Sequence, residues 1–268
     1  MYKNIHAILF FMIKRTAPII VGNWKSTPKT LDEGKKLIKH IEKKIASSKN
    51  KIPRKAYFVA APEIFIPHLA PLAKRGYIGA ENVSGFELGQ HTGVEIPAQL
   101  QSGGAAFTII GHSEIRKLGE TVEARAQKVA NALQIRLTTI VCFGEHKRDK
   151  EGRYLEELEN DVKQTLSLVK RELFSELIIA YEPVWAIGGT VPATPEECFE
   201  AVIAIRRALA SIAGIDYAKK VQILYGGTAT AENAKSFLEE GGVDGLLIGR
   251  ASQDAVSFIN IVNALYTH

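Results

Sequence analysis

The chain has 268 residues, of which 46% are hydrophobic and 24% are charged, so it can bury the core of one large α/β domain or of two small ones. Its formal net charge of +5 is scattered along the sequence rather than gathered in a stripe, which disfavours nucleic acid as a partner. The two cysteines, Cys142 and Cys198, do not form the pattern of a disulfide framework, and they indicate a reducing, cytoplasmic setting.

The beginning of the chain differs from the rest. Residues 5–13 form an apolar run between basic side chains. This run is too short to cross a bilayer, and no small-residue cleavage site follows it, so we expect neither a membrane span nor a signal peptide. We interpret residues 1–17 as an N-terminal extension, loosely ordered or lightly docked, ahead of a single domain at residues 18–268. Met12 is an alternative start of the protein.

From residue 18 onward, short apolar runs of strand type alternate with amphipathic stretches of helical period. The predicted strands cover residues 19–22, 57–60, 77–80, 108–110, 139–142, 177–180, 222–224 and 245–248. The predicted helices cover residues 31–45, 122–133, 155–169, 196–210, 231–239 and 255–266. Eight such units in about 250 residues predict a single-domain (β/α)₈ barrel with parallel strands. An open, doubly wound sheet is the alternative fold.

The sixth predicted strand ends at a single carboxylate, Glu182, directly before Pro183. A proline cannot donate a ladder hydrogen bond, so the strand stops there. Residues 183–193 combine bulky apolar side chains with a glycine pair, which is typical of a loop that closes over a ligand. Thr194 then caps a helix whose first residue is Pro195. This order predicts a general base beneath a closing loop, and an ordinary strand-to-helix connection is the alternative.

Two further strand ends carry polar side chains at the place where a barrel keeps its active residues. Asn23 and Lys25 follow the first strand, and a lysine there can offset negative charge on a substrate. His112 follows the fourth strand beside a helix start, which favours a neutral imidazole able to donate a proton. A solvated lysine and a packed structural histidine are the alternative interpretations.

The last two strands end in loops that contain glycine. Thr228 comes after the pair Gly226-Gly227 behind the seventh strand, and Gly249 and Arg250 follow the eighth. Loops in these positions commonly bind phosphate through backbone N–H groups and the N-terminus of a short helix. Glycine pairs also occur in ordinary turns. With a lysine available from the first strand, the pattern predicts a phosphorylated ligand.

Taken together, these segments resemble the triosephosphate isomerase family in order and spacing over residues 17–268. The matching segments are Asn23-Trp24-Lys25, Gly111-His112-Ser113-Glu114, Cys142-Phe143-Gly144-Glu145, residues 181–188 (YEPVWAIG), Tyr225-Gly226-Gly227 and Gly249. The resemblance implies an enzyme that interconverts dihydroxyacetone phosphate and glyceraldehyde 3-phosphate, in glycolysis and gluconeogenesis, with neither a cofactor nor a metal.

The resemblance also implies a role for each matching residue. Glu182 would be the base that moves a proton between carbons, and His112 would polarise the carbonyl and shuttle protons between the oxygens. Lys25 would stabilise the enediolate and the phosphate, and Asn23 would orient both. The backbone N–H groups that would hold the phosphate belong to Gly188, Thr228, Gly249 and Arg250. A closed loop would exclude water and protect the enediolate.

Several positions depart from the family pattern. The departures are Ser26 for methionine, Glu81 for glutamine, Thr228 for serine, Arg250 for glycine, and the sequence of the loop at residues 188–192. They leave the base in place, but they bear on rate, loop closure and substrate size. One alternative function is therefore a related isomerase that acts on a longer ketose phosphate, such as an erythrulose phosphate. A second is a catalytically silent binding barrel.

The connection at residues 79–97 is long for its position, which indicates a task beyond linking. In the family this loop inserts beside the neighbour's active site to form a twofold dimer, and Thr92 matches its tip. A glutamate and an arginine usually pair across that interface, and here Val94 and Ile115 replace them. Two packed aliphatic side chains avoid a stranded buried charge. The resemblance therefore implies a homodimer in which Val94 lies near Ile115 of the partner subunit.

Overall fold

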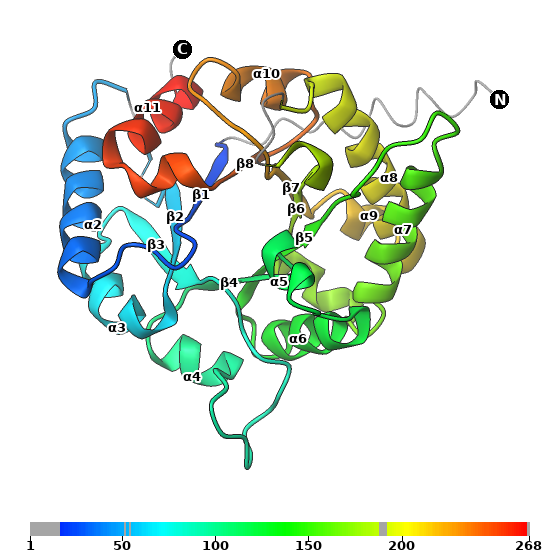
Figure 1. Ribbon diagram of the computed structural model, residues 1–268, viewed down its shortest axis with the longest axis horizontal. Helices are drawn as coiled ribbons and strands as arrows, with labels where there is room; N and C mark the ends of the chain where they lie inside the picture. The colour runs from blue at the N-terminus through cyan, green and yellow to red at the C-terminus, as the bar shows by residue number, and fades with distance from the viewer. Residues whose placement is uncertain (1–16, 51, 54, 188–191, 267–268) are drawn as a thin grey trace.

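The computed structural model describes residues 17–50, 52–53, 55–187 and 192–266. Within these ranges, eight parallel strands pair in sequence order and close into a barrel, with β8 hydrogen-bonded to β1. Helices surround the strands on all sides (Figure 1). The predicted single-domain (β/α)₈ barrel is confirmed. Nearly all of the proposed N-terminal extension lies outside the described residues.

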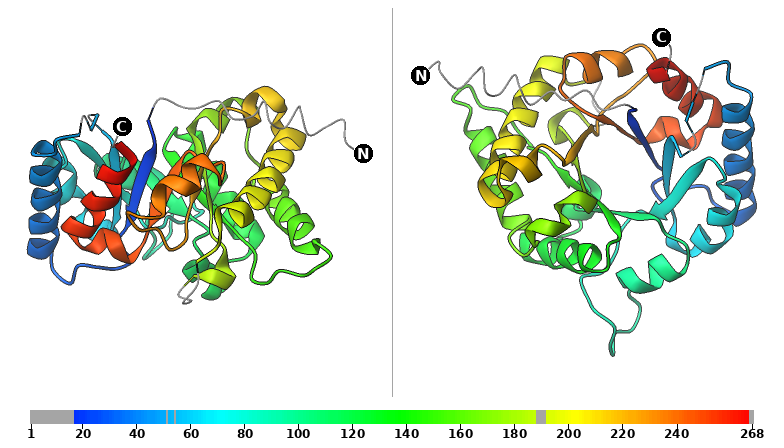
Figure 2. Two further views of the ribbon diagram at one scale, coloured as in Figure 1. Left: turned by 90° about the horizontal axis from the view of Figure 1, so that it is seen from above. Right: turned by 180° about the vertical axis from the view of Figure 1, so that it is seen from behind.

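The predicted strands are confirmed, and no end differs from its prediction by more than one residue. They are β1 (Ile19–Asn23), β2 (Tyr57–Ala61), β3 (Gly76–Ala80), β4 (Phe107–Ile110), β5 (Thr138–Phe143), β6 (Leu177–Tyr181), β7 (Gln222–Tyr225) and β8 (Gly245–Ile248). The long helices are α2 (Leu31–Ala46), α6 (Val122–Gln134), α7 (Arg153–Thr165), α8 (Pro195–Ala213) and α11 (Ala255–Tyr266). They stand along the outer wall of the barrel (Figure 2).

Short helices occupy the loops between these elements. They are η1 (Glu63–Phe65), α3 (Ile66–Leu69), η2 (Ala70–Leu72), α4 (Pro97–Ser102), α5 (Ser113–Lys117), η3 (Arg171–Glu176), η4 (Val184–Ala186), α9 (Ile215–Ala218), α10 (Ala234–Glu239) and η5 (Arg250–Gln253). Of the helices in the described ranges, none has both the length and the apolar character that a bilayer crossing requires.

Three predicted helix ends differ from the structure by three or more residues. The helix predicted at residues 196–210 continues to Ala213, and at the other two ends polar side chains bind nearby backbone groups. The helix predicted at residues 155–169 ends at Thr165, and the hydroxyl of Ser167 donates to the Gln164 carbonyl at 2.7 Å. The helix predicted at residues 231–239 begins only at Ala234. Such side-chain bonds compete with helix continuation and define helix ends.

The cap predicted for α8 is confirmed. The Thr194 hydroxyl accepts from the Glu197 backbone N–H at 3.2 Å, and the Glu197 carboxylate accepts from the Thr194 N–H at 2.7 Å. This reciprocal capping box satisfies two N–H groups that the first turn leaves without partners. It therefore fixes the chain where the connection after β6 enters α8.

The barrel interior is filled by apolar side chains from the strands. Among them are Val21, Ala60, Phe107, Ile140, Ala180 and Leu247, all of which are buried. A second, larger cluster packs the outer faces of the strands against the helices. The interior is thus a packed core, and the polar side chains of the strands gather at the strand ends.

A close approach of backbones closes the barrel. Gly245 of β8 lies against the carbonyl of Ile19 in β1, and a Cβ atom added to Gly245 would overlap that oxygen. Gly34 in α2 is different, because an added Cβ would meet the side chains of Pro28 and Leu69 at ordinary contact distances of 3.5 Å and more. An added methyl group is therefore expected to lower the stability of the protein at Gly245 and to raise it at Gly34.

We expect Gly245→Ala to lower the free energy of unfolding by about 2 kcal/mol or more, because backbone atoms must move to admit the methyl group. The matched control Gly34→Ala should raise it by about 0.5–1 kcal/mol, because alanine loses less entropy in a helix than glycine. Urea unfolding of both variants, followed by circular dichroism, measures the difference. A Gly245→Ala variant as stable as the wild type would contradict this account of closure.

Candidate active site

The polar side chains predicted to act together lie at one mouth of the barrel. Asn23 ends β1, His112 follows β4, Glu182 follows β6, and Gly249 follows β8. Because all eight strands are parallel and the barrel is closed, their carboxyl ends face the same side. Gly188, predicted to bind phosphate from the connection after β6, lies outside the described residues, as do residues 189–191.

His112 and Glu182 are in direct contact. The Nε2 atom of His112 lies 3.0 Å from Oε1 of Glu182, and both side chains are buried. The backbone N–H of Ser113 donates to the other carboxylate oxygen, Oε2, at 3.0 Å. Two adjacent donors therefore hold the carboxylate of Glu182 in one orientation.

The backbone also selects the tautomer of His112. The N–H of Glu114, in the first turn of α5, donates to Nδ1 of His112 at 3.2 Å. A nitrogen that accepts a hydrogen bond carries no proton, so the imidazole is neutral, with its proton on Nε2. Nε2–H is consequently the donor in the contact with Glu182, and it is the group that can donate to a substrate oxygen.

The pKa of Glu182 results from opposing effects. Complete burial raises it, whereas the hydrogen bonds that the carboxylate accepts from His112 and from the N–H of Ser113 lower it, and the pKa lies below the ordinary value for a glutamate. The carboxylate is therefore ionised at neutral pH. An ionised, desolvated carboxylate held by hydrogen bonds is ready to accept a proton from a carbon acid.

Lys25 reaches the same mouth from an unusual backbone conformation. Its φ is 53° and that of Ser26 is 57°, both in the left-handed region that residues with a side chain seldom adopt. Two side chains hold this turn. The amide oxygen of Asn23 accepts from the Lys25 N–H at 3.1 Å, and Oε2 of Glu81 accepts from the Ser26 N–H at 2.9 Å. Strain of this kind persists only where the surroundings impose it.

The Lys25 ammonium is available to a ligand. Its Nζ lies 2.9 Å from Oε1 of Glu114, and the two side chains are 26% and 55% exposed. Ion pairs exposed to this degree contribute little free energy, so a stronger anion can take the place of the carboxylate. Lys25 also passes close to Gly249, where an added Cβ would stand 3.4 Å from the lysine Cε.

The loops after β7 and β8 lie beside each other because these strands pair. Thr228 is exposed, and its carbonyl accepts from the Asn233 side chain at 3.0 Å. Arg250 is exposed at the start of η5, directly after Gly249. Lys25 and Gly249 are thus brought together, Arg250 follows Gly249 on the same strand end, and Thr228 lies on the neighbouring strand end.

A buried network behind the site carried no predicted role. Oε1 of Glu145, after β5, accepts from the Tyr181 hydroxyl at 2.9 Å, from Trp185 Nε1 at 2.8 Å and from Arg148 Nε at 2.9 Å. Tyr181 and Trp185 flank Glu182 in the sequence, so one carboxylate binds a side chain on each side of Glu182. The sequence signal was present, since Glu145 follows a strand and a basic residue stands three positions later.

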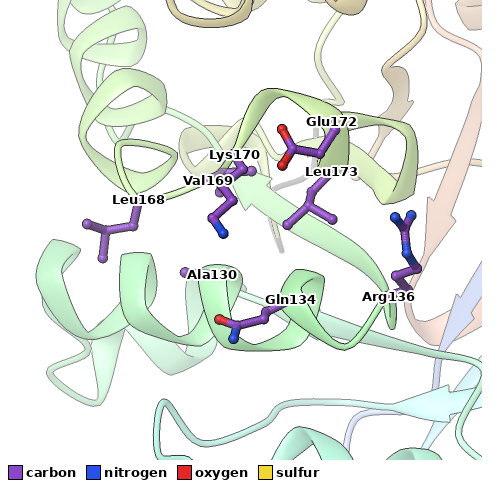
Figure 3. Close-up of a pocket in the computed structure, with 8 residues that line it drawn as sticks. All are labelled: Ala130, Gln134, Arg136, Leu168, Val169, Lys170, Glu172 and Leu173. Carbon is purple, nitrogen blue, oxygen red and sulfur yellow. The ribbon is translucent and has the colours of Figure 1, made fainter.

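A separate hollow of about 170 Å³ lies between α6 and η3, and Figure 3 shows its lining. Its residues are Ala130, Gln134, Arg136, Leu168, Val169, Lys170, Glu172 and Leu173. These residues precede β5 and β6, so the hollow opens at the amino end of the strands, opposite the mouth that holds His112 and Glu182. It therefore takes no part in the site.

Comparison with known proteins agrees with the geometry. The family model described as triosephosphate isomerase matches residues 18–265. Proteins named triosephosphate isomerase from Caldanaerobacter subterraneus and Bacteroides fragilis are 37% and 38% identical to this chain over 250 residues, which cover 92% of this chain and 98% of theirs. One from Clostridium botulinum is 37% identical over 251 residues, covering 93% of this chain and 99% of its own. The chain belongs to the triosephosphate isomerase family.

Proposed function

We propose that this protein interconverts dihydroxyacetone phosphate and D-glyceraldehyde 3-phosphate by proton transfer through an enediolate. The observation that carries the proposal is the 3.0 Å contact between His112 Nε2 and Glu182 Oε1, which joins a neutral acid and an ionised base at one strand-end mouth. Full-length relatives that bear the name of this isomerase support it. We further propose that it serves glycolysis and gluconeogenesis in the cytoplasm.

The first step is removal of a proton from the carbon beside the carbonyl. The Glu182 carboxylate exchanges its contacts with Ser113 and His112 for the substrate and takes that proton. The freed Nε2–H of His112 donates to the carbonyl oxygen. The C–H electron pair becomes the new C=C bond, and the carbonyl pair moves to oxygen, giving the enediolate.

The second step returns the proton to the neighbouring carbon. Glu182 donates the proton that it took, and His112 moves a proton between the two oxygens, so that the hydroxyl and carbonyl exchange places. Lys25 and Asn23 stabilise and orient the negative oxygen. The N–H groups of Gly188, Thr228, Gly249 and Arg250 hold the phosphate throughout the reaction.

The connection after β6 excludes water during these steps. Its leading end is fixed by Glu145, whose carbonyl accepts from the Val184 N–H at 3.1 Å and whose carboxylate binds the Trp185 indole. Its trailing end is fixed by the cap at Thr194. We propose that this connection shields the site from water, and a dry site strengthens every electrostatic contact within it.

The two alternative functions are not favoured by the comparisons, and one assay separates all three. An isomerase for a longer ketose phosphate would show a higher kcat/KM on a four-carbon sugar phosphate than on glyceraldehyde 3-phosphate. A silent binding barrel would turn over neither sugar. We expect the three-carbon substrate to be preferred.

Replacing the base by a shorter carboxylate tests its role. Glu182→Asp withdraws the carboxylate by one methylene, and a displacement of this size lowers kcat by about 100-fold, with a much smaller rise in KM. Steady-state kinetics with dihydroxyacetone phosphate in a coupled assay measures both constants. A variant that keeps more than half of the wild-type kcat would show that Glu182 is not the base.

We also propose that residues 1–17 form an extension ahead of the barrel domain at residues 18–268, since β1 begins at Ile19 and the family match begins at residue 18. The barrel domain is proposed to form a homodimer through the connection between β3 and α4, which projects from the body (Figure 1). This projection includes the half-exposed Phe86 and the strongly exposed Leu88. Exposed apolar side chains on a projecting loop are typical of an interaction surface.

The proposed interface pairs Val94 and Thr92 of one subunit with the region around Ile115 of the partner subunit. Val94 and Ile115 are each partly exposed in the single chain, so each has apolar surface left to bury. With no ion pair between these two positions, dissociation should depend little on salt.

Four proteins test this pairing. Ile115→Arg should weaken the dimer because it buries an unpaired charge, and adding Val94→Glu should recover part of the loss by giving the charge a partner. Val94→Glu alone completes the set. Sedimentation across a salt series measures dissociation, and a wild-type protein that is monomeric at micromolar concentration would end the proposal.

A further inference from the structure

Glu81 is a carboxyl group at the rim of the mouth where the family usually has a glutamine. It follows β3 directly, and its side chain is partly buried. Its Oε2 accepts from the Ser26 N–H at 2.9 Å, whereas its Oε1 is buried and has no hydrogen-bond partner among the described residues. Glu81 therefore braces the left-handed turn that presents Lys25, and it does so with a group that can change its charge.

The groups around Glu81 favour its neutral form. Glu63 of η1 faces it, with Oε1 accepting from the Glu81 N–H at 3.0 Å, and Glu95 adds a further negative charge near Glu63. His112 and the Lys25 backbone act in the opposite direction and favour the ionised form of Glu81. Lys128 binds the adjacent Asn82 side chain at 3.0 Å. Burial, opposed by the Ser26 N–H and reinforced by Glu63, raises the pKa of Glu81 to about 7.

We propose that Glu81 is a positioning residue for Lys25 that makes the binding of a dianionic ligand proton-linked, with tighter binding when its carboxyl is neutral. The inference rests on the proposed function, in which the phosphate of the substrate lies beside Lys25. Both protonation states keep an acceptor oxygen for the Ser26 N–H, so the turn persists while the local charge changes by one unit. An ionised carboxylate there opposes an incoming dianion, and by reciprocity a bound dianion promotes proton uptake at Glu81.

Sulfate is a suitable probe because it remains a dianion throughout the pH range, so that only groups of the protein titrate. We expect its dissociation constant in the wild type to rise by about three- to tenfold between about pH 6 and pH 9, as Glu81 ionises. Glu81→Gln retains an acceptor oxygen but never ionises. The dissociation constant of this variant for sulfate should not rise with pH. At high pH it should stay near the low value that the wild type shows at low pH.

Glu63→Gln is the matched control. It retains an acceptor oxygen for the Glu81 and Asn82 N–H groups, both bound at 3.0 Å, and removes only the neighbouring charge. Because Glu63 raises the pKa of Glu81, this variant should move the midpoint of the sulfate profile to lower pH and keep its amplitude. If Glu81 served only to hold the turn at Lys25, Glu63→Gln would change neither the midpoint nor the amplitude of the sulfate profile.

Calorimetric titration with sulfate, with inhibition of isomerisation measured in parallel, tests the inference. Parallel pH profiles in the wild type and Glu81→Gln, or an equal loss of affinity at every pH, would overturn it. The two proposals fail separately. A wild type that shows the Glu81-dependent sulfate profile but does not isomerise triose phosphates would contradict the proposed function, whereas an active isomerase with a profile unaffected by Glu81→Gln would contradict only this inference.

Discussion

The pairing of β8 with β1 is the constraint on which the site depends. It brings Lys25, at the end of the first strand, beside Gly249, at the end of the last. Long-range hydrogen bonds secure the junction, since the Trp24 indole donates to the Ser252 carbonyl at 3.0 Å and the Gln253 side chain donates to the Trp24 carbonyl at 2.8 Å. In an open sheet, the first and last strands would stand at opposite edges, and Lys25 would be far from Gly249 and the loop proposed to bind phosphate.

Within this frame, the chemistry depends on a few backbone N–H groups. The N–H of Ser113 orients Glu182, and that of Glu114 fixes the tautomer of His112. Both belong to the first turn of α5, so a single helix start orients His112 and Glu182, the proposed acid and base, together. Backbone donors suit this task because they cannot titrate and reorient little.

Much of this arrangement follows from sequence, because strand ends and parallel topology together place Asn23, His112 and Glu182 at one mouth. The left-handed turn at Lys25 could not be predicted, since it is imposed by Glu81, whose side chain comes from a different strand end. The sequence marks Glu145 by its place after a strand, but the donors that bind its carboxylate are assembled only in the folded barrel. The predicted end of α7 was wrong because a local hydroxyl, that of Ser167, binds a backbone carbonyl there.

The central claim is that the reaction moves a proton by way of Glu182 rather than a hydride between carbons. Conversion of dihydroxyacetone phosphate in heavy water tests this most directly. A proton held on a carboxylate exchanges with solvent, so the glyceraldehyde 3-phosphate that forms should carry deuterium at the carbon that was the ketone, as read by NMR after the product is trapped. Product that forms at full rate with only ordinary hydrogen at that carbon would contradict the account.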